Sequence, residues 1–273
     1  MYAELSLYEK YAVVPGTRVD LSQIDPNDTG DFATKKDARK ALKKLRKKLV
    51  DLQERFYAWD ARSILIVLQA MDTGGKDGTI EHVMQGTNPQ GVEVTSFKVP
   101  TAEELAHDFL WRVHKAVPPR RMIGIFNRSH YEDVLVVRVH NLVPETVWRK
   151  RYEQINDFER LLSENGVVLL KFYLHISRDE QARRLQARLD DPNKRWKFSK
   201  GDLEERALWD DYMAAYTDAL SLCSTPHAPW FVVPANHKWY RNYVVASILV
   251  ETLEQLNPQF PPPEENLDDV VVV

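Results

Sequence analysis

The stretch SILIVLQAMDTGGKDGT, residues 63–79, decides the fold of this chain. Residues 63–68 form a continuous apolar run with the length of a buried strand, and the glycines after it lead into a helical pattern. In such a turn the backbone N–H groups and the positive end of the helix point at one spot, where they bind phosphate. We therefore expect a strand–turn–helix unit that handles a phosphorylated substrate. The alternative is a glycine-rich turn that binds nothing.

This turn departs at two positions from the usual phosphate loop, Gly-x-x-x-x-Gly-Lys-Ser/Thr. Ala70 replaces the first glycine, and Asp77 replaces the serine or threonine whose hydroxyl normally binds Mg²⁺. A carboxylate must then be considered as the metal ligand, and Asp72, inside the loop, is the candidate. The residues expected to bind phosphate are Thr73, Gly74, Gly75, Lys76, Asp77, Gly78 and Thr79.

Length and composition favour a single large α/β domain over residues 1–273, because a chain with 44% hydrophobic residues can bury a large core. No apolar run approaches the roughly 20 residues that span a bilayer, so we expect a cytoplasmic protein without a membrane partner. The single cysteine, Cys223, cannot form an internal disulfide and is expected to fill a helix face.

A strongly basic amphipathic helix is expected over residues 35–59. Leucines recur there at helical spacing, while lysines and arginines crowd the remaining positions, although the net charge of the chain is only −3. This positive face either is simply solvated or attracts a polyanion. We do not expect a nucleic-acid partner, because no aromatic-rich reading motif and no zinc-binding spacing accompany the helix.

The rest of the chain alternates strand and helix. This order predicts a parallel sheet covered by helices on both faces, with ligands beyond the carboxyl ends of the strands. A capping box of Thr101 and Glu104 marks the start of one helix, which we expect to reach His114. The tail, residues 258–273, is expected to be irregular. The other expected strands cover 91–98, 122–126, 167–176 and 230–233, and the other helices cover 76–85, a segment after Pro144, and 239–256.

A second group of polar side chains follows the strand at 122–126, in the block FNRSHYED at 126–133. In phosphate-loop enzymes, a carboxylate near the end of an adjacent strand holds Mg²⁺ against the phosphates. Glu132 and Asp133 are available for this role, together with Arg128. His130 is favoured as a structural residue, because a hard cation prefers oxygen ligands.

A third group, at 177–205, is expected to form a helical lid. Ser177 can cap the helix, with Glu180 completing a capping box, and Arg184 and Arg188 lie four residues apart on one face. Mobile arginines neutralise the charge of a transferring phosphoryl group and exclude water. The alternative is an ordinary exposed helix rich in arginine. The lid residues expected to act are Arg183, Arg184, Arg188, Lys194 and Arg195.

Taken together, the segments 72–78, 126–133, 193–198 and 239–242 resemble the second family of polyphosphate kinases, over roughly residues 11–260. The resemblance implies a three-layer, thymidylate-kinase-like P-loop fold with a parallel five-stranded sheet and an arginine-rich lid. It implies Mg²⁺ as cofactor, and transfer of a terminal phosphate of inorganic polyphosphate to a nucleotide, so that the partners are polyphosphate and AMP, ADP or ATP. It also makes a homodimer or homotetramer plausible.

Residue roles follow from the same resemblance. By motif, Asp72 and Asp133 would bind Mg²⁺, while Lys76 and the loop amides would hold phosphate. Arg128 and the lid arginines would steady the transferring group.

The block at 126–133 also bears on the acceptor. Members that phosphorylate ADP commonly show Phe-Asp-Arg-Ser-x-Tyr-Asn-Arg, where this chain has Asn127, Glu132 and Asp133 at the variable positions. The departure resembles the branch that accepts both AMP and ADP, so we expect reversible formation of ADP and ATP. Glu132 either fills the gap left by the shorter nucleotide or only orients Arg128.

Two other classes of function remain open at this point. An ATP-dependent nucleoside monophosphate kinase would share the fold and the lid, but its loop would more often keep the serine or threonine that Asp77 replaces. A non-enzymatic binder of polyanions or nucleic acid would explain the basic helix. It would have no need of Asp72 and Asp133 beside Lys76.

Overall fold

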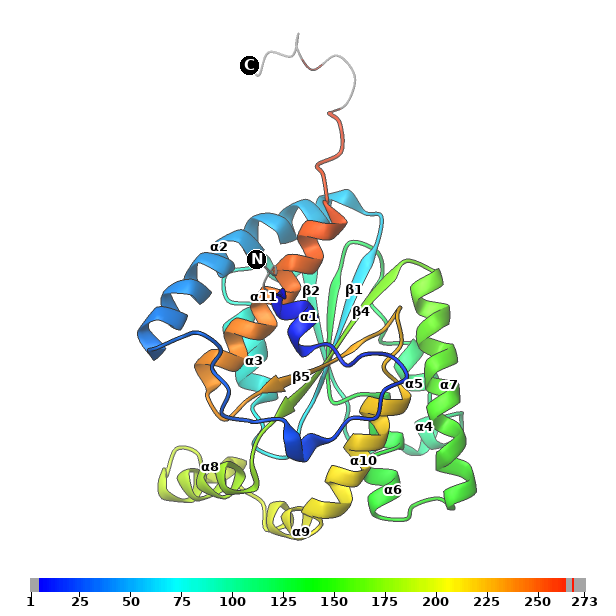
Figure 1. The fold of residues 1–273 in the computed structure, drawn as a ribbon. Helices are drawn as coiled ribbons and strands as arrows, with labels where there is room; N and C mark the ends of the chain where they lie inside the picture. The colour runs from blue at the N-terminus through cyan, green and yellow to red at the C-terminus, as the bar shows by residue number, and fades with distance from the viewer. Residues whose placement is uncertain (1–4, 264–266, 268–273) are drawn as a thin grey trace.

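The computed structural model describes residues 5–263 and 267, and its centre is a five-stranded parallel sheet (Figure 1). The strand order is β2-β3-β1-β4-β5, so β1 lies in the middle with the later strands on both sides. All neighbouring strands pair in parallel register, which confirms the sheet expected from the sequence. The strands are β1 Ser63–Gln69, β2 Val92–Ser96, β3 Ile123–Asn127, β4 Val167–His175 and β5 Trp230–Pro234.

The burial of each strand follows its place in the sheet. Every residue of the central strand β1 is buried, and so is every residue of β4 except one. Strands covered on both faces read as continuous apolar runs, which is the pattern that the sequence shows at 63–68. The edge strand β2 has no fully buried residue, and its sequence alternates accordingly.

Helices cover both faces of the sheet, so the molecule has the three layers expected from the sequence (Figure 1). In the view of Figure 1, α2, α3 and α11 lie on one side of the strands, and α7 and α10 lie on the other. The helices of the first side are α1 Leu7–Tyr11, α2 Lys35–Trp59, α3 Lys76–Val83 and α11 Lys238–Leu256. Those of the second side are α5 Trp111–His114, α6 Val136–Val139, α7 Glu145–Glu164 and α10 Trp209–Leu222.

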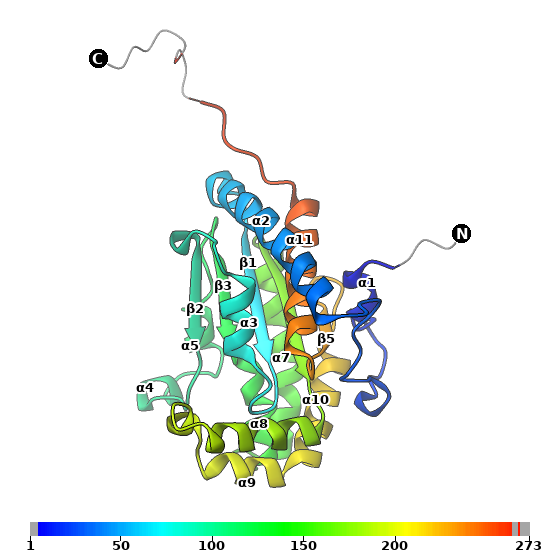
Figure 2. The ribbon, with the colours of Figure 1, turned by 90° about the vertical axis from the view of Figure 1, so that its left-hand side faces the viewer.

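The segments expected to form a lid lie beyond the carboxyl ends of the strands (Figures 1 and 2). Helix α8 (Arg178–Asp190) and helix α9 (Gly201–Ala207) are joined by the 3₁₀ turn η4 (Arg195–Lys197). They form a layer across the end of the sheet where the turn after β1 emerges (Figure 2). Short elements complete the chain: η1 Leu21–Gln23, η2 Pro89–Gly91, α4 Ala102–Leu105 and η3 His130–Asp133.

The basic helix α2 has the bounds predicted from its pattern, with Thr34 as its cap. It packs along α11, and Lys48 forms an ion pair with Glu254 of that helix. The other side of α2 is exposed, and four lysines on it form no ion pair with any described residue. Lys36, Lys40, Lys43 and Lys47 share this side.

Two local expectations are wrong. The helix expected from Thr101 to His114 is two separate turns, α4 and α5, because the chain leaves the helical path at 106–110. The capping box with Thr101 is present. The second box is only half formed: Ser177 accepts from the N–H of Glu180, but the Glu180 carboxylate binds Arg183 and Arg184 instead of the cap.

No helix in the described ranges, 5–263 and 267, combines the length and hydropathy needed to cross a bilayer. Residues 258–263 have no regular secondary structure, as expected for the tail. The remainder of that tail lies outside the described residues, apart from residue 267.

A buried ion pair joins β4 to α7, on the face of the sheet that α7 covers. Lys171 on β4 donates to Glu159 on α7 at 2.5 Å, and both side chains are fully buried. Glu159 also accepts from the Tyr131 hydroxyl at 2.9 Å and contacts Nε2 of His130 at 3.1 Å. Although burial raises it, the pKa of Glu159 is held below its usual value by Lys171 and His130. This cluster fixes the turn η3, which confirms His130 as a structural residue.

Breaking this pair on one side should destabilise the protein strongly. Glu159→Leu leaves the Lys171 ammonium buried without its counter-charge, and we expect a loss of roughly 3–5 kcal/mol in the free energy of unfolding. Lys171→Met should cost a similar amount. The double variant should lose clearly less than the sum of the two. Urea denaturation of all four proteins measures this, and additive losses would contradict the coupling.

Candidate active site

The turn between β1 and α3 has the backbone geometry of an anion-binding nest. Thr73 and Gly75 adopt positive φ angles of 62° and 100°, and the Gly74 N–H donates to the Met71 carbonyl at 2.9 Å. Gly75 caps α3 and offers no side-chain acceptor to the first N–H groups of the helix. Those donors are therefore free to bind phosphate at the positive end of the helix.

Lys76, the first residue of α3, lies inside this turn rather than in solvent. Its ammonium donates to the Ala70 carbonyl at 3.2 Å, which folds the side chain back along the loop. Burial lowers the pKa of Lys76, and the neighbouring Arg128 lowers it further, against the opposite effect of Asp72 and Glu132. The site thus holds two positive charges, Lys76 and Arg128, at half-buried positions that a phosphate anion can reach.

Strand β3 brings a second set of polar groups to the loop. Asn127 is the register partner of Leu68 on β1, so the residues after it emerge beside the loop. Arg128 has a positive φ of 62°, and its guanidinium lies 3.5 Å from the Asp72 carboxylate. A non-glycine residue in this backbone region is uncommon and occurs often at functional sites. Although burial lowers it, the pKa of Arg128 is raised overall by Glu132 and Asp72.

One contact of the site was not foreseen from the sequence. The Asn127 amide donates to the Asp77 carboxylate at 2.7 Å, joining the end of β3 to the first turn of α3. Asp77 stands where the usual phosphate loop has a serine or threonine. The hydrogen bond from Asn127 therefore fixes the position of the carboxylate that replaces the loop hydroxyl. The sequence did offer one indication of this role: Asn127 directly follows the expected buried strand at 122–126, at the edge of the sheet where ligands bind. Thr79, another expected phosphate ligand, is buried and donates to the Gly75 carbonyl inside the helix.

The two neighbouring carboxylates of η3 have different partners. Asp133 accepts from Arg151 of α7 at 2.8 Å, and both side chains are largely buried. Burial raises the pKa of Asp133 although Arg151 opposes this. Glu132 is the carboxylate that acts on Lys76 and Arg128. Asp133 is thus engaged by Arg151 in this structure, and its pairing with Asp72 around Mg²⁺ stays a prediction.

Helix α10 also contributes to this site, which the sequence did not indicate. Burial raises the pKa of Tyr216 well above its usual value, and the charge of Glu132 raises it further. Burial also raises the pKa of Tyr212, and so does Glu205 of α9, to which its hydroxyl donates at 2.5 Å. Both phenols stay protonated at neutral pH, and because the Tyr212 hydroxyl already donates to Glu205, Tyr216 is the one that can donate a hydrogen bond near Glu132.

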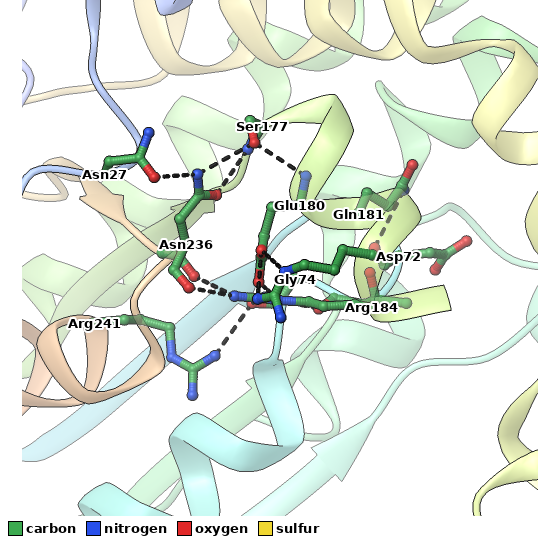
Figure 3. Close-up of polar contacts among 12 residues, drawn as sticks. Asn27, Asp72, Gly74, Ser177, Glu180, Gln181, Arg184, Asn236 and Arg241 are labelled. Carbon is green, nitrogen blue, oxygen red and sulfur yellow. Dashed lines mark hydrogen bonds and ion pairs between the residues drawn. The ribbon is translucent and has the colours of Figure 1, made fainter. Parts of the chain in front are cut away.

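Arg184 supports the loop from behind instead of acting as a free lid charge (Figure 3). Its guanidinium donates to the carbonyl oxygens of Thr73 at 2.9 Å and Gly74 at 3.2 Å. It also donates to Ala235 and Asn236, while Glu180 neutralises it at 2.5 Å. The expectation that Arg184 faces the transferring group does not fit this arrangement, since all these partners are protein groups.

The remaining lid residues lie on the surface and bind within their own segment. Arg183 forms a bidentate pair with Glu180, and Arg188 lies 3.5 Å from Asp202. Lys194 pairs with Asp191 at 2.6 Å, and Arg195 donates to a backbone carbonyl of α8. Burial and the charge of Asp72 raise the pKa of Asp202, so the pair of Arg188 and Asp202 lies near the loop, whereas no contact among the described residues joins the other three side chains to it. Their action on phosphate stays a prediction that requires the segment to move.

The carboxylates of the site fit a weakly held Mg²⁺ better than a preformed metal centre. Among the described residues no group of three or more His, Cys, Asp or Glu side chains is placed to hold a metal. Mg²⁺ is commonly bound by one or two carboxylates, with phosphate oxygens and water completing its octahedron. Asp72 and Glu132, beside Lys76, offer donors of this kind.

Comparisons with known proteins point to one family. Residues 33–261 match the family model described as polyphosphate kinase 2. The AMP/ADP-polyphosphate phosphotransferase of Meiothermus ruber is 57% identical, covering 97% of this chain and 99% of the relative. The ADP-polyphosphate phosphotransferase of Rhodopseudomonas palustris is 44% identical, covering 93% and 92%. The crystal structure of polyphosphate kinase 2 from Arthrobacter aurescens TC1 has a TM-score of 0.93 at 46% identity, covering 97% and 94%.

The different partners of Asp72 and Asp133 predict different effects on stability. Asp133→Ala should lower the free energy of unfolding by about 1–3 kcal/mol, because Arg151 loses its partner in a largely buried place. Asp72→Ala should cost less than about 1 kcal/mol, since its contact with Arg128 is long and partly exposed. Chemical denaturation tests both, and an equal cost would show that Asp133 is not structural.

Proposed function

The chain belongs to the polyphosphate kinase 2 family, and we propose that it transfers the terminal phosphate of inorganic polyphosphate to AMP and to ADP. AMP becomes ADP, ADP becomes ATP, and the polyphosphate becomes one unit shorter. The observation that carries the proposal is the site itself, in which a phosphate nest with Lys76 faces Arg128 and Glu132. The relative from Meiothermus ruber, named for both acceptors, supports the acceptor range.

The loop side of the site would hold the phosphate donor. The free N–H groups at the start of α3 and the ammonium of Lys76 would bind the terminal phosphates of the chain. Lys76 is desolvated, so its attraction for an anion is stronger than that of an exposed lysine. Binding would release it from the Ala70 carbonyl.

The η3 side would hold the acceptor and the group in transit. Arg128 lies between Asp72 and Glu132, with nearly half of its side chain exposed, so it can donate to oxygens of the transferred phosphate. An oxygen of the nucleotide phosphate would attack in line, and the polyphosphate oxygen would leave toward the loop. The buried cluster of Glu159 and Lys171 keeps the η3 turn rigid during this step.

We propose Mg²⁺ as the cofactor, held by Asp72 together with Glu132 in place of Asp133. When bound, Mg²⁺ would neutralise charge on the phosphate oxygens. Asp77, fixed by Asn127, lies in the same region and can orient water around the ion. A cytoplasmic location, a homodimer or homotetramer, and the absence of a nucleic-acid partner stay predictions from the sequence.

One assay tests the proposed activity. Purified protein with Mg²⁺, AMP and polyphosphate, without ATP, should form ADP first and ATP later, as followed by chromatography. Polyphosphate should be consumed in proportion to the phosphate bonds formed. An enzyme that needs ATP as donor would give no product here, and a protein that only binds polyanions would leave AMP unchanged.

The proposed metal ligands can be separated by substitution. Asp72→Asn and Glu132→Gln should each lower kcat by at least about a hundredfold with little change in thermal midpoint, because they remove charge needed only for chemistry. Asp133→Asn should keep more activity and lose more stability. The measurement is kcat as a function of Mg²⁺ concentration. Full activity of Asp72→Asn at every concentration would exclude the metal role.

Glu132 should also influence acceptor choice. If its carboxylate holds an ion or a water in the gap left by AMP, Glu132→Asn should cost at least about tenfold more kcat/KM with AMP than with ADP, or about 1.4 kcal/mol. Steady-state kinetics with each acceptor at saturating polyphosphate gives the ratio. Equal losses would mean that Glu132 only orients Arg128.

A further inference from the structure

A second buried arginine lies behind the phosphate loop, on the first turns of α11. The guanidinium of Arg241 donates to the Gly74 carbonyl at 3.3 Å (Figure 3). Only 2% of this residue is exposed. A Cβ atom built on Gly75 would lie 1.9 Å from Nη1 of Arg241. The loop is therefore built around this guanidinium, and Gly75 leaves the space that the guanidinium occupies.

Arg241 differs from its neighbour Arg184 in its charge balance. Arg184 is paired with Glu180, whereas no carboxylate of residues 5–263 or 267 lies within ion-pair distance of Arg241. Its Nε and Nη2 both donate to the side-chain oxygen of Asn242, at 3.0 Å and 2.7 Å. A neutral amide thus stands where a carboxylate would usually bind a buried guanidinium.

A buried charge without a counter-charge is energetically unfavourable, and this lowers the pKa of the group that carries it. Burial and the nearby charge of Arg184 lower the pKa of Arg241 to about 9. A protein retains such a charge more readily when an anion balances it in the working state. The adjacent structure is the loop that binds phosphate, and Gly78, on the first turn of α3, also faces this guanidinium.

We propose that Arg241 is a positioning residue whose uncompensated charge, kept free by Asn242, is balanced by the phosphate chain bound on the other side of the loop. It shapes the loop through Gly74 and strengthens anion binding without touching the substrate. The proposal rests on the proposed function of the loop as the polyphosphate site.

The sharpest test replaces Asn242 by an isosteric carboxylate. Asn242→Asp keeps an acceptor for Arg241 at the same place, so the loop keeps its shape, but it neutralises the guanidinium. Gln255→Glu adds the same charge at the exposed far end of α11 and serves as the matched control. Arg241→Met removes the charge and the hydrogen bonds together. The probe is inorganic tripolyphosphate without nucleotide, measured by calorimetry, with thermal midpoints of the free proteins.

Asn242→Asp should bind tripolyphosphate about five- to tenfold more weakly than wild type while its ligand-free thermal midpoint stays equal or rises. Its KM for polyphosphate should increase more than its kcat falls. Arg241→Met should bind equally weakly or worse, and Gln255→Glu should match wild type. Unchanged affinity in Asn242→Asp would overturn the proposal and leave Arg241 as a brace of the loop.

These outcomes are separate from the proposed activity. Binding of tripolyphosphate is measured without turnover, so a wild type that binds it but forms no ADP would refute the activity and leave this inference standing. A wild type that forms ADP from AMP while Asn242→Asp binds as tightly would refute the inference alone.

Discussion

The turn between β1 and α3 can bind an anion because its carbonyl oxygens accept hydrogen bonds from other parts of the protein. Arg184 takes the oxygens of Thr73 and Gly74, Arg241 also reaches Gly74, and Gln181 donates to the carbonyl of Asp72 at 3.2 Å. A loop whose oxygens are held from behind presents its N–H groups to the front. The anion site thus depends on donors from α8 and α11, which lie far from the loop in sequence.

The charges around the loop are arranged in two layers. Behind it, Arg184 is neutralised by Glu180 and Arg241 is not. In front of it, Lys76 and Arg128 face Asp72 and Glu132 at partly exposed positions. An anion that enters this space meets positive charge from both layers. A cation meets the carboxylates of Asp72 and Glu132 at the front, because the Glu180 carboxylate behind the loop is already paired with two arginines. This asymmetry suits a phosphate chain accompanied by a divalent ion.

The sequence predicts the elements of this fold well where the pattern is local. The strands at 63–69 and 167–175 read as apolar runs because both faces are covered, and α2 was predicted with the bounds that the structure has. The prediction failed between Thr101 and His114, where a cap starts a helix that ends after one turn. Helix propensity alone does not decide how long a short helix continues when packing does not support it.

By itself the sequence determined the parallel sheet, the nest after β1, and the presence of Lys76, Arg128 and two carboxylates near it, because these depend on periodicity and on adjacent residues in the chain. Only the tertiary structure decided which of them meet. The charge of Glu132 acts on Lys76 and Arg128, whereas the adjacent Asp133 pairs with Arg151 of α7. The partners of the two buried arginines, Glu180 and Asn242, are close in sequence, but the burial of both guanidinium groups against Gly74 depends on packing of α8 and α11 on a distant loop, and no local pattern encodes that packing.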